Sequence, residues 1–111
     1  MDSGIYYVIF KSHNGRFGDG LVVVDNGKIH GGDQRYLYRG FYKADGPTIE
    51  AEIQVSYYRG EPKSVLGPLA KFSLNLGGNS SPGAFTVNGH VFGQSQLAIS
   101  IEGQKQADLV S

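Results

Sequence analysis

Histidine is the residue type in this chain best suited to bind a metal ion or to transfer protons near neutral pH. The chain has three, His13, His30 and His90, and their spacing places no two of them on one face of a strand. A zinc site needs several ligands that converge on one point. The pattern therefore favours solvated histidines in turns or at strand ends, and it predicts no metal site.

A second candidate is the carboxylate pair Glu50 and Glu52, which lie two residues apart and so share one face of a strand. Two carboxylates can divide the roles of general acid and general base. Here, however, they alternate with an apolar row and stand beside Thr48, Gln54 and Ser56. A solvent-exposed face explains this pattern better than catalysis does.

Two glycine-rich segments, Gly18-Asp19-Gly20 and Gly31-Gly32-Asp33, resemble phosphate-binding loops only in composition. Neither carries Lys-Ser or Lys-Thr and neither leads into a helix, so turns and bulges are the better interpretation. The chain has no cysteine, and no serine lies in a Gly-x-Ser-x-Gly elbow. Because no nucleophile can be paired with a base, we expect no enzyme activity and no cofactor.

Length and charge narrow the class of protein further. The 111 residues suit one domain covering 1–111. Lys and Arg number 10, as do Asp and Glu, and this balance argues against direct nucleic-acid binding. No apolar run approaches the ~20 residues of a membrane helix, so no membrane insertion is expected. The acidic start, Met1 to Gly4, is unlike a signal peptide and the lack of cysteine suits a reducing compartment, so we expect a cytoplasmic location.

The elements that would position these residues are all strands. Aromatic and β-branched runs alternate with turn signals such as Asn14-Gly15 and Asn26-Gly27. At most one short helical segment fits, near 62–68. We also expect a flexible turn over 77–83 and a frayed tail over 103–111. The predicted strands cover 5–10, 17–24, 28–30, 35–43, 48–58, 71–76, 85–92 and 97–101.

Eight strands joined mainly by short turns predict an all-β fold, an eight-stranded antiparallel up-and-down barrel. Closure removes the exposed edges that a long antiparallel sheet must otherwise manage. Such a barrel is either filled by its own side chains, which is the simpler interpretation, or wide enough for one small ligand. The residues predicted to face the interior, and to line an apolar cavity if there is one, are Ile49, Ala51, Ile53, Val55, Tyr57, Phe72, Leu74, Leu76, Leu97, Ile99 and Ile101.

The first two strands differ from the others because both of their faces are apolar. Every residue from Ile5 to Phe10 is apolar or aromatic, and Leu21 to Val24 repeats this. A barrel strand needs only one dry face, so the other should be covered, either by segment 59–68 or by a second subunit. We hypothesise a homodimer interface. The residues assigned to this dimer or outer-wall contact are Tyr6, Val8, Phe10, Val22 and Val24.

Several short motifs are informative through their order and spacing. They are Gly4-Ile5-Tyr6 leading into Ile9-Phe10, Gly18-Asp19-Gly20, Asn26-Gly27 before Ile29, Gly31-Gly32-Asp33, Tyr38-Arg39-Gly40 and Ser64-Val65-Leu66. In these motifs the chain resembles the GrlR family, whose members are small negative regulators of type III secretion genes. The resemblance is strongest from Gly4 to about Leu66.

The resemblance implies a calycin-like, lipocalin-type barrel, a homodimer, a hydrophobic cavity that accepts lipid, and no catalysis. It also implies a protein partner, a helix-turn-helix transcriptional activator, bound with the help of an acidic Glu-Asp-Glu-Asp loop. The corresponding partner-binding loop here is Lys43, Ala44, Asp45 and Gly46, followed by Pro47. Only Asp45 is acidic, so a charge-complementary contact with a basic activator would be much weakened.

Two functions follow as expectations. The first is a non-enzymatic regulatory protein that binds a protein partner such as a transcriptional activator. The alternative is a small lipocalin-like carrier or sensor that holds an apolar or lipid ligand inside the barrel. Both can hold together if ligand binding alters the interaction surface.

Overall fold

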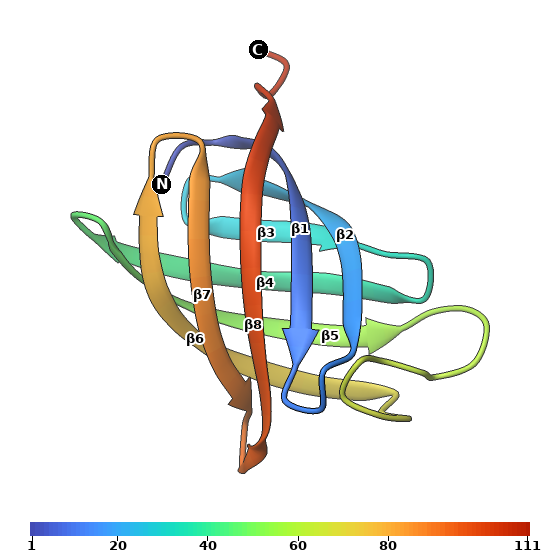
Figure 1. Ribbon diagram of the computed structural model, residues 1–111. Coiled ribbons are helices and arrows are strands. Elements are labelled where there is room, and N and C mark those ends of the chain that lie inside the picture. The colour runs from blue at the N-terminus through green and yellow to red at the C-terminus, as the bar shows by residue number, and fades with distance from the viewer.

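The computed structural model describes residues 1–111. It contains one sheet of eight antiparallel strands, in which each strand pairs with the next one along the chain. The last strand returns to pair with the first, so the sheet closes into the predicted barrel (Figure 1). The all-β, eight-stranded, up-and-down prediction is therefore confirmed. The strands are β1 (Gly4–Ser12), β2 (Phe17–Asp25), β3 (Lys28–Gly32), β4 (Tyr36–Asp45), β5 (Thr48–Tyr57), β6 (Lys71–Ser81), β7 (Ala84–Val91) and β8 (Gln94–Ala107).

Turn chemistry fixes where strands reverse. Asn26 and Gly27 both adopt positive φ, 47° and 81°, in the turn between β2 and β3. Two consecutive positive φ values characterise the type I′ turn, whose twist matches that of the flanking strands. Asn tolerates this conformation better than most residues and Gly adopts it freely, so the dipeptide sets the register in which Asp25 pairs with Lys28.

Two strands are longer than the sequence predicts. β6 continues through Ser81, so the flexible turn expected over 77–83 shrinks to Pro82 and Gly83. β8 continues to Ala107, so the expectation of a frayed tail from residue 103 is wrong for 103–107. In both places the residues are polar or small and give no local signal. Pairing with β5 and β7, or with β7 and β1, keeps them extended.

The connection between β5 and β6, residues 58–70, contains turns and an isolated bridge between Ser64 and Gly67. The short helix that 62–68 could have formed is not present there. The chain as a whole offers no helix of the length and apolarity that crossing a membrane requires.

Inward-facing glycines let the strands curve and approach closely. A Cβ atom at Gly31 or Gly40 would clash with a carbonyl oxygen of the neighbouring strand, that of Leu21 or Glu52 respectively. Gly78 and Gly89 are equally crowded. Glycine at such positions permits the tight bends that closing a barrel requires.

The end of the barrel that carries both chain termini is closed by packed side chains (upper end in Figure 1). Tyr6 is fully buried there, and its ring lies 5.4 Å from that of Phe85. The Tyr6 hydroxyl donates to the carbonyl oxygen of Asp2 at 2.7 Å, and the Asp2 carboxylate accepts the N–H of Gly83 at 3.0 Å. These bonds hold the N-terminal residues across this end.

Candidate ligand-binding cavity

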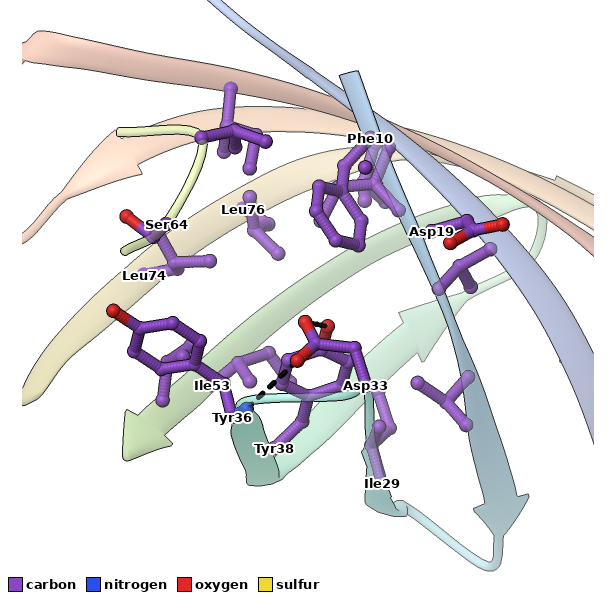
Figure 2. A pocket seen from close by; sticks show the side chains of 18 of the residues that line it. Phe10, Asp19, Ile29, Asp33, Tyr36, Tyr38, Ile53, Ser64, Leu74 and Leu76 are labelled. Carbon is purple, nitrogen blue, oxygen red and sulfur yellow. Dashed lines mark hydrogen bonds between the residues drawn. The ribbon is translucent and has the colours of Figure 1, made fainter. Parts of the chain in front are cut away.

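The interior of the barrel is hollow. A cavity of about 390 Å³ extends along it, within the range of small-molecule sites. Of its 29 lining residues 22 are hydrophobic, so the cavity is chemically an apolar one. Phe17, Gln34 and Lys63 lie at its mouth, at the end of the barrel opposite the chain termini. Figure 2 shows part of its wall from close by.

The residues predicted to face the interior mostly do so. Tyr57 and Leu97 are the two that do not line the cavity. Tyr57 lies at the end of β5, is 37% exposed, and donates its hydroxyl to the carbonyl oxygen of Gly60. Leu97 packs against the core instead. The predicted residues that do line the cavity are Ile49, Ala51, Ile53, Val55, Phe72, Leu74, Leu76, Ile99 and Ile101.

The assignment of one face of β1 and β2 to the outer wall is wrong. Tyr6, Val8, Val22 and Val24 are buried in the core, and Phe10 packs against it and lines the cavity. The neighbouring residues in each strand point outward instead, including Ile9 and Leu21, which are 43% and 52% exposed. Because both faces are apolar, periodicity alone could not say which faces inward.

Segment 59–68 also lies elsewhere than expected. Its Leu66 is buried and its Val65 lines the cavity, so the segment closes over part of the barrel's mouth and leaves the outside of β1 and β2 uncovered. The hydroxyl of Tyr36 donates to the carbonyl oxygen of Leu69. The Arg35 guanidinium donates to the carbonyl oxygen of Glu61 at 3.1 Å. These bonds tie the β5–β6 connection to the start of β4.

The Gly18-Asp19-Gly20 segment serves packing inside the barrel. A Cβ atom at Gly18 would overlap the ring of Phe10, and one at Gly20 would lie 3.1 Å from the Tyr38 hydroxyl oxygen. The two rings stand edge to face, with centroids 6.4 Å apart. Each glycine thus leaves room for an aromatic ring from a neighbouring part of the wall. Two glycines spaced by one residue in a strand could have signalled this, because they share one face.

Asp33 is the residue that sequence reasoning missed as part of the site. It follows β3 directly, and its carboxylate lies among the apolar side chains of the cavity, close to Tyr38 (Figure 2). Its Oδ1 accepts the backbone N–H groups of Arg35 and Tyr36, both at 2.8 Å, and its Oδ2 accepts the hydroxyl of Tyr38. Aspartate often bonds the backbone two or three residues ahead, so Gly-Gly-Asp before a strand was a signal for this turn.

Tyr38 is held in its neutral form. Burial raises its pKa above the usual value for tyrosine, because desolvation disfavours the phenolate, and the hydrogen bond to Asp33 raises the pKa further. The phenol therefore stays a donor to Asp33 under ordinary conditions. The pair forms a polar group inside an otherwise apolar wall.

Two side chains from the β5–β6 connection hold the loop that carries Asp33 in place. The Tyr58 hydroxyl donates to the backbone carbonyl of Asp33 at 2.8 Å, and Arg59 Nε donates to that of Gln34 at 2.7 Å. On the rim, Asp19 accepts the hydroxyl of Tyr7 at 2.7 Å. The position of Asp33 is thus fixed by backbone and side-chain bonds together.

The other candidate residues lie away from the cavity. Glu50 and Glu52 are exposed on the outside of β5, where they pair in register with Lys43 and Phe41. The three histidines stay apart, and no three of the chain's His, Asp and Glu side chains gather as metal ligands. His90 Nδ1 lies 3.0 Å from the carbonyl oxygen of Val91. The cavity can bury apolar groups and accept hydrogen bonds.

The predicted partner-binding loop, Lys43 to Gly46, forms the hairpin between β4 and β5 and is exposed. It lies at the end of the barrel opposite the cavity mouth. Its role in binding a partner stays a prediction.

Comparison with known proteins gives no relative that would assign this cavity. No protein-family model matches the chain, and no curated protein matches it. The resemblance to the GrlR family therefore stays a prediction. The geometry of the barrel is what bears on function.

Proposed function

We propose that this protein binds a small apolar molecule inside its barrel and acts without catalysis, as a carrier or a sensor. The observation that carries the proposal is the apolar cavity of about 390 Å³ that ends in a mouth at one end of the barrel. An eight-stranded barrel is either filled by its own side chains or wide enough for one small ligand, and the interior of this one is hollow.

Energetics support an occupant for the cavity. Apolar atoms that line an unfilled cavity lack packing partners on one side and so lose dispersion contacts. An apolar ligand would supply those contacts and would remove the apolar wall from water, which favours binding.

A titration with a neutral fluorescent probe, phenylnaphthylamine, tests this proposal. We expect saturable binding of one probe per chain, with displacement by dodecanol. Ala51→Leu should weaken binding because the larger side chain enters the cavity, whereas Gln54→Leu, on the outer face of the same strand, should leave binding unchanged. A well-folded protein that binds neither probe nor alcohol would contradict the proposal.

A second candidate function is a regulatory interaction with another protein, as the resemblance to the GrlR family implies. The outer surface of the barrel supports it because some strands expose large apolar side chains. β5 and β8 expose polar residues such as Glu50, Gln54 and Ser100. Ile9, Leu21 and Leu37 instead expose 43%, 52% and 45% of their surface on β1, β2 and β4. Leu21 and Leu37 both pair with Gly32, which has no side chain to separate them.

We call Ile9, Leu21 and Leu37 the outer patch and propose it as the surface of a homodimer or of a complex with a regulator. Exposed apolar patches of this kind mark interaction sites. Light scattering at micromolar concentration should give a dimer mass that Leu21→Gln lowers. A strictly monomeric wild-type mass would contradict the homodimer. Recovery of no transcription factor from the host's lysate would count against the regulatory role. Both candidate functions suit the proposed cytoplasmic location.

A further inference from the structure

The Asp33 carboxylate is a polar group placed where an apolar ligand would meet it. It lies inside the cavity near the mouth, with the ring of Tyr38 beside it (Figure 2). No cation lies within ion-pairing distance of it, since the one salt bridge in the molecule joins Lys105 to Asp108. Any molecule that fills the cavity to its mouth must therefore be compatible with this carboxylate.

The carboxylate has room for one more donor. Arg35 and Tyr36 supply two backbone N–H groups to Oδ1, and Tyr38 supplies its hydroxyl to Oδ2. A carboxylate offers about four acceptor positions, so one position on Oδ2 stays open. While the Tyr38 hydroxyl donates its hydrogen to Asp33, the Tyr38 oxygen can also accept a hydrogen bond from a ligand.

Each of the three hydroxyls near Asp33 already donates its hydrogen to an acceptor within the protein and so cannot donate it to a ligand. Tyr36 donates to the carbonyl oxygen of Leu69, and Ser64 donates to that of Gly67. Tyr38 donates to Asp33 and, through burial and that bond, has a raised pKa that keeps its proton in place. The hydroxyls in this part of the cavity can therefore act towards a ligand only as hydrogen-bond acceptors.

The charged groups on the rim do not reverse the preference for a ligand that donates hydrogen bonds. The Arg35 guanidinium donates one N–H to the carbonyl oxygen of Glu61, and Lys63 is exposed to solvent. Asp19, on the same rim, offsets part of their positive charge. A ligand carboxylate next to the Asp33 carboxylate would face a like charge, which is unfavourable in a largely apolar site.

We propose that the ligand is a single-chain amphiphile whose head group donates hydrogen bonds, a hydroxyl or an amine, and that Asp33 binds this head group. The inference rests on the proposed function and specifies the chemistry of the same cavity. It assigns the chain of the ligand to the apolar wall and its head to the mouth. It also makes Asp33 the residue that determines specificity.

Three ligands with the same chain and different heads test this proposal, namely dodecanol, dodecylamine and dodecanoate. Each is titrated against bound phenylnaphthylamine. We expect the alcohol and the amine to bind at least about tenfold more tightly than dodecanoate, since a hydrogen bond to a charged group is worth that much. Asp33→Asn keeps an acceptor for the backbone N–H groups but replaces Oδ2 by a donor. It should therefore reduce the ratio of amine to carboxylate affinity by about tenfold or more.

Asp19→Asn is the matched control, because it removes the same charge from the rim without removing any hydrogen bond to Asp33. It should change the affinity ratio much less than Asp33→Asn does. Equal effects of the two substitutions, or tighter binding of dodecanoate by the wild type, would overturn the proposal and leave apolar binding intact. Failure of all three ligands to displace a bound probe would also overturn the proposal, whereas failure of the probe and the alcohol to bind at all would overturn the proposed function as well.

Discussion

Filling the cavity from its wall should stabilise the ligand-free protein, and Ala51→Leu is the substitution that tests this. Ala51 faces inward on β5, in register with Tyr42 and Leu76, and lines the cavity. The change adds three carbon-sized groups, worth about 0.8 kcal/mol each when buried, or ~2.4 kcal/mol. Ordering a leucine side chain costs about 0.5–1 kcal/mol. The net expected gain in the free energy of unfolding is about 1.5 kcal/mol.

The assay is urea unfolding of protein stripped of bound lipid, with the midpoint compared at unchanged slope. Gln54→Leu on the outer face of β5 is the control, and its effect should stay within about 0.5 kcal/mol. A well-packed interior would respond in the opposite direction, because extra methylenes in a filled core destabilise by about 1–3 kcal/mol. A lower midpoint for Ala51→Leu would therefore refute the hollow interior on which the ligand argument depends.

Three further predictions concern the wall, the polar pair and the mouth. Gly31→Ala should destabilise the barrel by about 3 kcal/mol or more, because its Cβ meets the Leu21 carbonyl oxygen. Gly77→Ala, with its nearest atom 3.8 Å away, should be near neutral in the same urea unfolding experiment. The raised pKa of Tyr38 means that the unfolded chain loses this proton first as the pH rises past about 10, so stability falls there. The fall should be up to ~1.4 kcal/mol per pH unit steeper in the wild type than in Tyr38→Phe, and parallel profiles between about pH 9 and 11 would count against it. Leu66→Ala should cost about 2–5 kcal/mol in thermal or urea unfolding, since Leu66 is buried at the mouth, and a change below about 0.5 kcal/mol would show that segment 59–68 does not pack there.

Local patterns in the sequence determined the strands and most of the turns. Asn26-Gly27 specifies its hairpin because few other dipeptides adopt two positive φ values without strain. The alternation from Ile49 to Val55 gave the inward face of β5 correctly, since only one of its faces is apolar. Both signals act between residues close in the chain, so no tertiary information is needed to interpret them.

Tertiary structure decided what local patterns left undetermined. β1 and β2 are apolar on both faces, so the alternation of their residues does not indicate which face points inward. In the folded barrel, where β8 pairs with β1, Val8 and Phe10 face inward. The same closure extended β8 to Ala107, where polar and small residues offer no local preference.

The hollow interior and its polar group also depend on tertiary structure. Whether a barrel is filled depends on the sum of inward side-chain volumes against its width, which tilt and register set across all eight strands. Asp33 could be recognised locally as a turn residue. Its place beside Tyr38 within an apolar wall, however, depends on the curvature that brings the β3–β4 loop over the mouth. The sequence alone thus determined the barrel, and only the folded chain decided that it is hollow and has an acceptor at its mouth.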